Sequence, residues 1–293
     1  MEHLPKITKS VRLPLDIPGM SYLQDHCFEQ TAVLPAVEAC ELLALAVKNE
    51  LSGAEVSSIT KAEFNKFLFL EPSQKKAASF CDLALYENND VRASLVTKRK
   101  GRKSAISRTM EHASVVFGQK ERSRSAPSFD KASVTGEEWM EIPAQRVYDE
   151  LVLFGPSYRN IRDVLSVSRK GAIAKIKAPA KPGQNNTADI LGSPFVLDAA
   201  FHAACVWGQR FHCSVRFPVG FERRVIHKKT KPHTYYVAMV IPRCEQKEEI
   251  LFDIWIFDKK GELFESTRGV KMRDVSRGRI KPPEWITLTG ESG

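Results

Sequence analysis

The sequence predicts an α+β fold made of two similar halves, each with antiparallel strands packed around one buried helix. Two observations predict this plan. Residues 36–51 and residues 191–207 each form a long, mainly apolar segment of helical length. Around each of them lie short segments rich in β-branched and aromatic residues, separated by turn signals, which are typical of antiparallel strands. The same order of elements in both halves indicates one plan used twice, without a strong repeat of residues.

The composition limits the class of protein. The chain has 293 residues, 43% of them hydrophobic, which suits one large domain or two modest ones. It contains no run of 18 apolar residues, and its N-terminus lacks the apolar core of a secretory signal. Its six cysteines form no CxxC pair, so we expect free thiols and no metal site. These features predict a cytoplasmic protein without a membrane contact.

Changes in composition divide the chain. We expect an N-terminal half at residues 1–118 and a C-terminal half at residues 144–275. Residues 119–143 are polar, with Ser-Arg repeats and prolines, and are interpreted as a linker. Residues 276–293 contain prolines without hydrophobic periodicity and are interpreted as a tail.

The net charge of +9 favours anionic partners. An acidic carrier protein and nucleic acid both fit this charge. The basic residues gather at 98–108 and 120–124 with few aromatic residues between them, which disfavours stacking on single-stranded nucleic acid. We therefore expect no nucleic-acid partner, and we interpret residues 98–108 as a solvated hairpin or loop.

In the first half, residues 1–20 contain three prolines and are expected to form an extended lead-in. Pro35 suits the first turn of the helix at 36–51, where its missing N–H costs little. Ser52 and Gly53 suit the end of that helix. Strands are predicted at 59–70, 77–86, 90–100 and 112–118.

In the second half, a short helix is predicted at 145–153 and a tight turn at 154–158. The second long helix spans 191–207, after a loop rich in Pro, Gly and Asn. Strands are predicted at 164–168, 172–178, 219–228, 235–242, 250–257 and 264–273.

Two ionisable residues lie inside the apolar segment 191–207. Asp198 and His202 are four residues apart, so they share one face of the helix and are within side-chain reach. A buried carboxylate needs a partner. The pair is either a structural contact in the core or a catalytic acid held by a histidine, and the stretch alone does not decide between the two.

A histidine in the first half complements this pair. His26 follows Asp25 in a short segment that ends at Pro35. If the two halves pack side by side, His26 and Asp198 can meet at their interface, where ligand pockets are common. Two such groups can divide base and acid work between them.

Four short segments together resemble a known family. Residues 26–35 resemble the pattern HxxxGxxxxP, with His26 and Pro35 in place. Residues 154–158 (FGPSY) resemble YGPxF, and residues 197–202 (LDAAFH) resemble LDxxxH/Q. Residues 217–222 resemble the LP-containing segment that follows. In this order, the segments resemble the dehydratase domains of polyketide synthases, which have the double hot-dog fold. The similarity spans roughly residues 5–275.

The resemblance implies an enzyme that acts on a 3-hydroxyacyl thioester. The substrate would be carried on the phosphopantetheine of an acyl carrier protein, and water would leave to give a 2-enoyl thioester. His26 would remove the α-proton and Asp198 would protonate the leaving hydroxyl. No metal or organic cofactor is implied. Carrier protein, other synthase components and a second copy of the chain are the expected partners.

The resemblance also assigns supporting roles. His202 would orient the Asp198 carboxyl, and Phe154 and Tyr158 would line the acyl tunnel. Gly155 and Pro35 belong to the matching motifs and are expected to support the site. The helix that opens near Pro35 offers backbone N–H groups to the thioester oxygen as negative charge develops there.

Two positions depart from the family pattern. The glycine of the first motif is Gln30 here, which could disturb the pocket if that position requires a positive φ or a close backbone approach. The tyrosine before Gly-Pro is Phe154, which removes a hydroxyl. Both catalytic residues are retained, so an active enzyme is expected.

Two other functions remain open. A double-bond isomerase or product-template-type cyclase would use a similar His/Asp pair on the same fold. A non-catalytic module would bind carrier protein or a synthase component. Arg216, Arg223 and Arg224 flank the fourth motif and are either a solvated edge or a contact for the carrier and its phosphopantetheine. The other histidines, at positions 112, 212, 227 and 233, show no ligand spacing and are interpreted as surface or strand residues.

Overall fold

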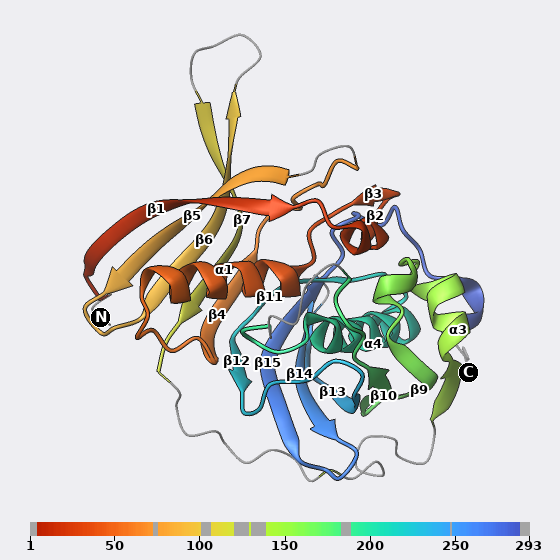
Figure 1. Ribbon diagram of the computed structural model, residues 1–293. Coiled ribbons are helices and arrows are strands. Elements are labelled where there is room, and N and C mark those ends of the chain that lie inside the picture. Colours follow the sequence, from red (N-terminus) through yellow and green to blue (C-terminus); the bar gives the residue numbers. More distant parts are fainter. Residues whose placement is uncertain are drawn as a thin grey trace.

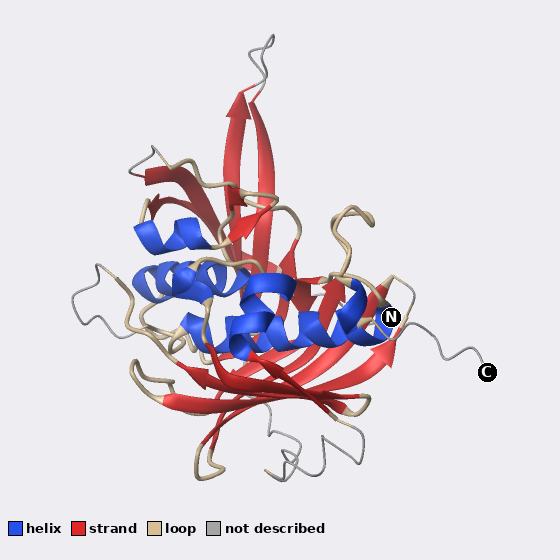
Figure 2. Ribbon diagram, turned by 90° about the vertical axis from the view of Figure 1, so that its right-hand side faces the viewer, coloured by secondary structure: helices blue, strands red, loops and turns tan. Residues whose placement is uncertain are grey.

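A computed structural model describes residues 5–72, 76–100, 107–119, 129, 139–182, 189–246 and 248–287. These residues form one antiparallel sheet of thirteen strands that curves around two long helices (Figure 1). Both helices lie on the same side of the sheet and pack against each other (Figure 2). The predicted α+β plan, with antiparallel strands around two buried helices, is confirmed.

Within the described residues, the first half contains one long helix, a short 3-10 helix and seven strands. In chain order they are β1 (Ile7–Pro18), η1 (Ser21–Asp25), β2 (Cys27–Phe28), β3 (Thr31–Ala32), α1 (Ala36–Glu50), β4 (Ser58–Phe64), β5 (Lys76–Tyr86), β6 (Val91–Lys100) and β7 (Ser107–Phe117). The expected lead-in is therefore largely a strand, because β1 pairs with β5 along its whole length.

The strand predicted at 59–70 ends early, at Phe64. The N–H groups of Asn65 and Lys66 both point at the carbonyl oxygen of His112, at 2.8 and 3.3 Å. Two successive residues cannot share one acceptor within a regular ladder. Residues 65–70 therefore leave the sheet as a loop, and Leu34 N–H donates to the carbonyl of Leu68 in that loop (2.9 Å).

The described part of the second half contains the other long helix, several short helical turns and eight strands. In chain order they are β8 (Met140–Pro143), α3 (Ala144–Arg146), the π-helix η2 (Val147–Leu151), η3 (Pro156–Tyr158), β9 (Ile161–Ser168), β10 (Gly171–Lys177), α4 (Pro194–His212), β11 (Phe217–Phe221), β12 (Arg223–Ile226), β13 (Tyr235–Glu245), β14 (Glu249–Asp258), β15 (Leu263–Arg273) and η4 (Glu284–Ile286).

Three elements of the second half differ from expectation. The helix predicted at 145–153 is a single α-turn followed by a π-turn. The strand predicted at 219–228 is broken at Glu222 into β11 and β12. Helix α4 runs past Trp207 to His212 and ends where Cys213 adopts a left-handed conformation (φ 49°), a common helix stop.

The two halves follow one topology. The strand order is β1-β5-β6-β7-β4 in the first half and β8-β9-β10-β13-β14-β15-β11 in the second, with β12 between β15 and β4. In each half the strand that follows the long helix lies at the inner edge. These inner strands pair with each other, since β4 bonds to β11 and β12. The backbone hydrogen bonds therefore continue from one half into the other.

Gly220 lies on β11 where this strand pairs with β4 of the other half. A Cβ atom at this position would lie 2.4 Å from the carbonyl oxygen of Ala62 on β4. That distance is far below van der Waals contact, so only glycine allows β11 to pair with β4 here.

The segments outside the two halves are partly structured. Most of the expected linker, 119–143, lies outside the described residues, but its last four residues form β8, which pairs with β9. Within the expected tail, Ser276 and Ile286 are fully buried, and the Arg146 guanidinium lies 3.5 Å from the centre of the Trp285 ring. The tail to Thr287 is thus packed against the second half, and residues 288–293 lie outside the described residues.

A buried ion pair stabilises the inner edge of the second half. The Nε and Nη2 atoms of Arg224 on β12 donate to the two carboxylate oxygens of Glu265 on β15, at 2.8 and 3.1 Å. Only 1% and 3% of these side chains are exposed. Thr267 donates a further hydrogen bond to Glu265 (3.2 Å).

None of the helices in the described part of the chain is long and apolar enough to cross a membrane.

Arg224→Ala is expected to lower the free energy of unfolding by about 3–5 kcal/mol, because it leaves the Glu265 carboxylate buried without its partner. Urea denaturation followed by circular dichroism measures this loss. The exposed pair Arg243–Glu222 provides the control, and Arg243→Ala should cost about 0–1 kcal/mol. Equal losses for the two variants would contradict the assignment of a stabilising role to the buried pair.

Candidate active site

His26 lies at the end of η1, immediately before β2. Its backbone N–H donates to Leu23 O (3.3 Å), and its carbonyl accepts the N–H of Val33 (2.9 Å). The ring Nδ1 lies 3.2 Å from the carbonyl oxygen of Val33. A carbonyl can only accept a hydrogen bond, so Nδ1 carries the proton of the neutral ring. The lone pair of Nε2 is then free to act as a base.

The surroundings of His26 favour the neutral ring. Burial lowers its pKa below the ordinary value of 6.5, and the nearby His202 acts in the same direction. Asp198 and the hydrogen bond to Val33 oppose this shift but do not outweigh burial. His26 is therefore in its basic form at neutral pH.

Asp198 and His202 lie on the buried face of α4. Asp198 Oδ2 is 2.9 Å from His202 Nε2. The two atoms are close, but their angles do not meet those of a hydrogen bond. Within the described residues, neither atom has another hydrogen-bond partner. Behind it, the Tyr148 hydroxyl lies 3.3 Å from His202 Nδ1. His202 thus lies against one oxygen of the carboxyl, and the other oxygen, Oδ1, faces His26.

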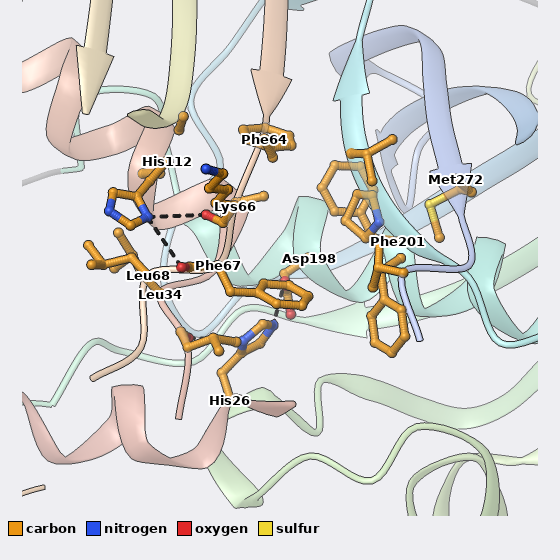
Figure 3. A pocket seen from close by; sticks show the side chains of 18 of the residues that line it. His26, Leu34, Phe64, Lys66, Phe67, Leu68, His112, Asp198, Phe201 and Met272 are labelled. Atoms are coloured by element: carbon orange, nitrogen blue, oxygen red, sulfur yellow. Dashed lines mark hydrogen bonds and ion pairs between the residues drawn. The ribbon is translucent and has the colours of Figure 1, made fainter. Parts of the chain in front are cut away.

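The base and the carboxyl come from different halves and face each other. His26 Nε2 lies 3.8 Å from Asp198 Oδ1 (Figure 3). This is too long for a direct hydrogen bond. It is close enough for the two groups to serve two adjacent carbon atoms, which lie about 1.5 Å apart. The arrangement can remove a proton from one atom and give a proton to a group on the next.

A cavity of about 260 Å³ surrounds this pair, and residues of both halves line it. Leu34, Leu68 and His112 lie on one side of the pair, and Phe201 and Met272 lie on the other (Figure 3). The walls are mainly apolar. The lining also includes Val33, Ala36, Ala39, Phe64, Asn65, Lys66, Phe67, Leu95, Ala113, Val152, Phe154, His202, Cys205, Arg216, Phe217, Pro218, Val219 and Val275.

The turn at 154–158 holds His26 against the second half. Gly155 N–H donates to the Asp25 carbonyl (2.7 Å), and Ser157 N–H donates to the Asp25 carboxylate (2.9 Å). A Cβ at Gly155 would lie 2.4 Å from that carboxylate, so the close approach requires glycine. Asp25, which precedes His26, thereby fixes the base relative to this turn.

The aromatic residues of the turn contact His26 directly. Phe154 stacks on the imidazole with ring centres 4.3 Å apart and 23° between the planes, and it lines the cavity. Tyr158 meets the imidazole edge-on at 5.0 Å. Tyr158 is fully buried and is not among the residues that line this cavity, so its predicted role as tunnel lining stays a prediction. It supports the base from behind.

Pro35 stands just before helix α1 rather than in its first turn. Ala36 and Ala39, which follow it, line the cavity. The N-terminal end of α1, with its partial positive charge, therefore borders the cavity near His26.

No group of three or more potential metal ligands is found among the residues that the structure describes.

Several residues have surroundings that the sequence did not predict. His112 is a strand residue on β7, but it is buried and lines the cavity. Its Nδ1 faces the carbonyls of Lys66 and Phe67, at 3.3 and 3.2 Å, so it holds the wall loop. Arg216 is buried and lines the cavity, and Arg224 is in the buried ion pair, so neither belongs to a solvated edge. Tyr148 was missed, because no motif marks it.

Gln30, which stands where the family pattern has glycine, lies in a strained turn. Glu29 and Gln30 connect β2 and β3, and both have positive φ, 46° and 65°. A two-residue hairpin turn of this kind prefers Asn-Gly, since glycine adopts positive φ without strain. Gln30 is exposed and does not line the cavity. The substitution therefore strains the hairpin next to His26 without narrowing the pocket.

Known proteins resemble this chain in sequence and in fold. A family model described as "Polyketide synthase dehydratase N-terminal domain" matches residues 126–281. A polyunsaturated fatty acid synthase polypeptide of Thraustochytrium sp. is 26% identical over 275 aligned residues, which cover 88% of this chain and 9% of that protein. The chain thus corresponds to a small part of that relative.

Solved structures share the fold. The dehydratase domain of a mycocerosic acid synthase-like polyketide synthase superposes with a TM-score of 0.72, at 16% identity, covering 92% of this chain and 93% of that one. The dehydratase domain of PpsC from Mycobacterium tuberculosis, solved in complex with C12:1-CoA, gives a TM-score of 0.66 at 16% identity, covering 91% and 94%. These likenesses confirm the double hot-dog fold.

Gln30→Gly is expected to raise the free energy of unfolding by about 0.5–1 kcal/mol, because relief of the positive-φ strain exceeds the greater freedom of glycine in the unfolded chain. Urea denaturation checks this. Gln30→Ala is the matched control, since alanine removes the side chain but keeps the Cβ and the strain. Equal stability of the two variants would show that φ at Gln30 is not the source of strain.

Proposed function

Because the chain belongs to the polyketide synthase dehydratase family, we propose that it removes water from a 3-hydroxyacyl thioester to give a 2-enoyl thioester. The observation that carries this proposal is the placement of His26 Nε2 and Asp198 Oδ1, 3.8 Å apart and facing one apolar cavity. The acyl group is proposed to arrive on the phosphopantetheine of an acyl carrier protein. Other synthase components are proposed partners, and no metal or organic cofactor enters the proposed reaction.

The reaction is an elimination across two adjacent carbons. His26 Nε2 takes the proton from the carbon next to the thioester carbonyl, and the electron pair of that C–H bond forms the new double bond. The C–O bond at the third carbon breaks. Its hydroxyl receives the proton of Asp198 Oδ1 and leaves as water. The base ends protonated and the acid ionised, so one proton returns from His26 to Asp198 before the next turnover.

Three features support these roles. Burial keeps His26 neutral and therefore able to accept a proton. The apolar cavity suits an acyl chain, and the M. tuberculosis dehydratase domain of similar fold was solved in complex with C12:1-CoA. The positive end of α1 at Ala36 borders the cavity, where backbone N–H groups can stabilise negative charge on the thioester oxygen.

The decisive test is mass spectrometry of a 3-hydroxyacyl-pantetheine or carrier-protein thioester after incubation with the protein. Loss of one water with the wild type is expected. His26→Ala and Asp198→Asn are each expected to lower the rate about 10²–10⁴-fold, because each removes a proton-transfer group. His212→Ala, on the exposed end of α4, is the control and should retain the rate.

The same samples separate the rival functions. Migration of the double bond in a supplied 2-enoyl thioester, without any dehydration of the 3-hydroxyacyl thioester, would replace the proposal with an isomerase. No change of either substrate, over several chain lengths, would favour a carrier-binding module. Asp198→Asn should keep the fold by circular dichroism, whereas an unfolded variant would support a purely structural role for the pair.

The pH dependence of kcat/KM follows from the lowered pKa of His26. A base with a pKa below 6.5 is more than half unprotonated at pH 6.5. We therefore expect more than half of the maximal kcat/KM at pH 6.5. At lower pH, kcat/KM should fall with a slope that approaches tenfold per pH unit. An acidic limb with its midpoint above 6.5 would contradict the assignment of the buried, neutral His26 as the base.

A further inference from the structure

A buried chain of polar contacts continues behind Asp198. The Tyr148 hydroxyl accepts the backbone N–H groups of Asn160 and Ile161, each at 2.9 Å. Two accepted bonds occupy the lone pairs of the hydroxyl oxygen, so its hydrogen is left to be donated. The acceptor that faces it is His202 Nδ1, at 3.3 Å. Tyr148 and His202 are 3% and 4% exposed, so water does not compete for these groups.

These polar contacts select one tautomer of the neutral His202 ring. A neutral imidazole has one N–H and one lone pair. Because Nδ1 accepts from Tyr148, the N–H must be on Nε2, which faces Asp198 Oδ2 at 2.9 Å. In the other form, the lone pair of Nε2 would face Asp198 and would draw the proton of the acid to Oδ2, away from the cavity. The helix spacing of Asp198 and His202 alone does not choose between the two forms.

We propose that Tyr148 is a positioning residue of the catalytic acid, which holds the Nε2–H form of His202 and thereby leaves the transferable proton on Asp198 Oδ1. This inference rests on the dehydration proposed above. Oδ2 is the oxygen that lies 2.9 Å from His202 Nε2, whereas Oδ1 faces His26 and the cavity. Tyr148 itself does not line the cavity and does not touch the substrate.

The local backbone supports this role. Tyr148 lies in the π-helix Val147–Leu151, which is closed by a hydrogen bond from Val152 N–H to Val147 O (2.8 Å). The wide turn changes the angular position of its side chains relative to an α-helix, and such turns concentrate at functional sites. Burial also raises the pKa of Tyr148, so the hydroxyl keeps the proton that it donates.

Two matched variants test the proposal. Tyr148→Phe removes the hydroxyl and nothing else. Tyr236→Phe is the control, because Tyr236 is an equally buried tyrosine on β13 whose hydroxyl accepts the N–H of Lys231 (2.7 Å) away from the cavity. Both variants lose a buried hydroxyl and some stability, but only Tyr148→Phe changes the surroundings of His202.

The first readout is the protonation of the His202 ring nitrogens in long-range proton–nitrogen NMR spectra of histidine-labelled protein, assigned with His202→Gln. The wild type and Tyr236→Phe should show a proton on Nε2 only, and Tyr148→Phe should show a mixture of both forms. A proton on Nδ1 in the wild type, or an unchanged ring in Tyr148→Phe, would overturn the proposal.

The second readout is kinetic. Tyr148→Phe is expected to lower kcat about tenfold with KM within about twofold, as for loss of a partner that orients a catalytic group. In the His202→Gln background the amide always offers an N–H to Asp198, so Tyr148→Phe should lower kcat no further there.

The two readouts separate the possible failures. A lower Tm in Tyr148→Phe with an unchanged ring form and an unchanged kcat would assign Tyr148 a structural role only and overturn the proposal. Because the NMR readout needs no substrate, it also stands apart from the reaction. Absence of dehydration in the wild type, with the ring forms as expected, would overturn the proposed function and leave the control of His202 by Tyr148 supported.

Discussion

The pairing of β4 with β11 and β12 is the constraint on which the rest of the molecule depends. It joins two similar sets of strands into one sheet, so both long helices are placed on the same face and against each other. His26 lies between η1 and β2, ahead of α1, and Asp198 lies on α4. Their separation is therefore fixed by backbone hydrogen bonds between the halves rather than by flexible side chains, as a site divided between two elements requires.

A second constraint follows from burial. Every residue of α4 from Pro194 to Gln209 is buried, so the ionisable groups on it must find partners inside the protein. Tyr148 and His202 supply the contacts behind Asp198, and the Trp207 indole and Gln209 amide donate to backbone carbonyls. This apolar packing removes the water that would hydrate a charged group. It also keeps water away from His26 and Asp198, and electrostatic interactions between the two groups are stronger without it.

The sequence predicted the two helices and most strands because their signals are local: an apolar period for the helices and short β-rich runs for the strands. It did not predict where β4 ends, because that depends on a carbonyl of His112 far along the chain. For the site, the motif pattern singled out His26, Asp198 and His202. Tyr148 was not predicted as a site residue, because its partner His202 is 54 residues away in the sequence. The π-helix that contains Tyr148 also has no periodic pattern that the sequence would reveal.

The two long helices differ at the position that carries the acid. Counted from the first residue of each helix, Cys40 of α1 holds the place that Asp198 holds in α4, and Ala44 holds the place of His202. Both first-half residues are buried and apolar in character. The two halves thus contribute different groups to the pair, the imidazole of His26 from one and the carboxyl of Asp198 from the other. Although the described strands repeat one topology, the pair has two unlike ends, so a molecule in this cavity meets a different group at each end.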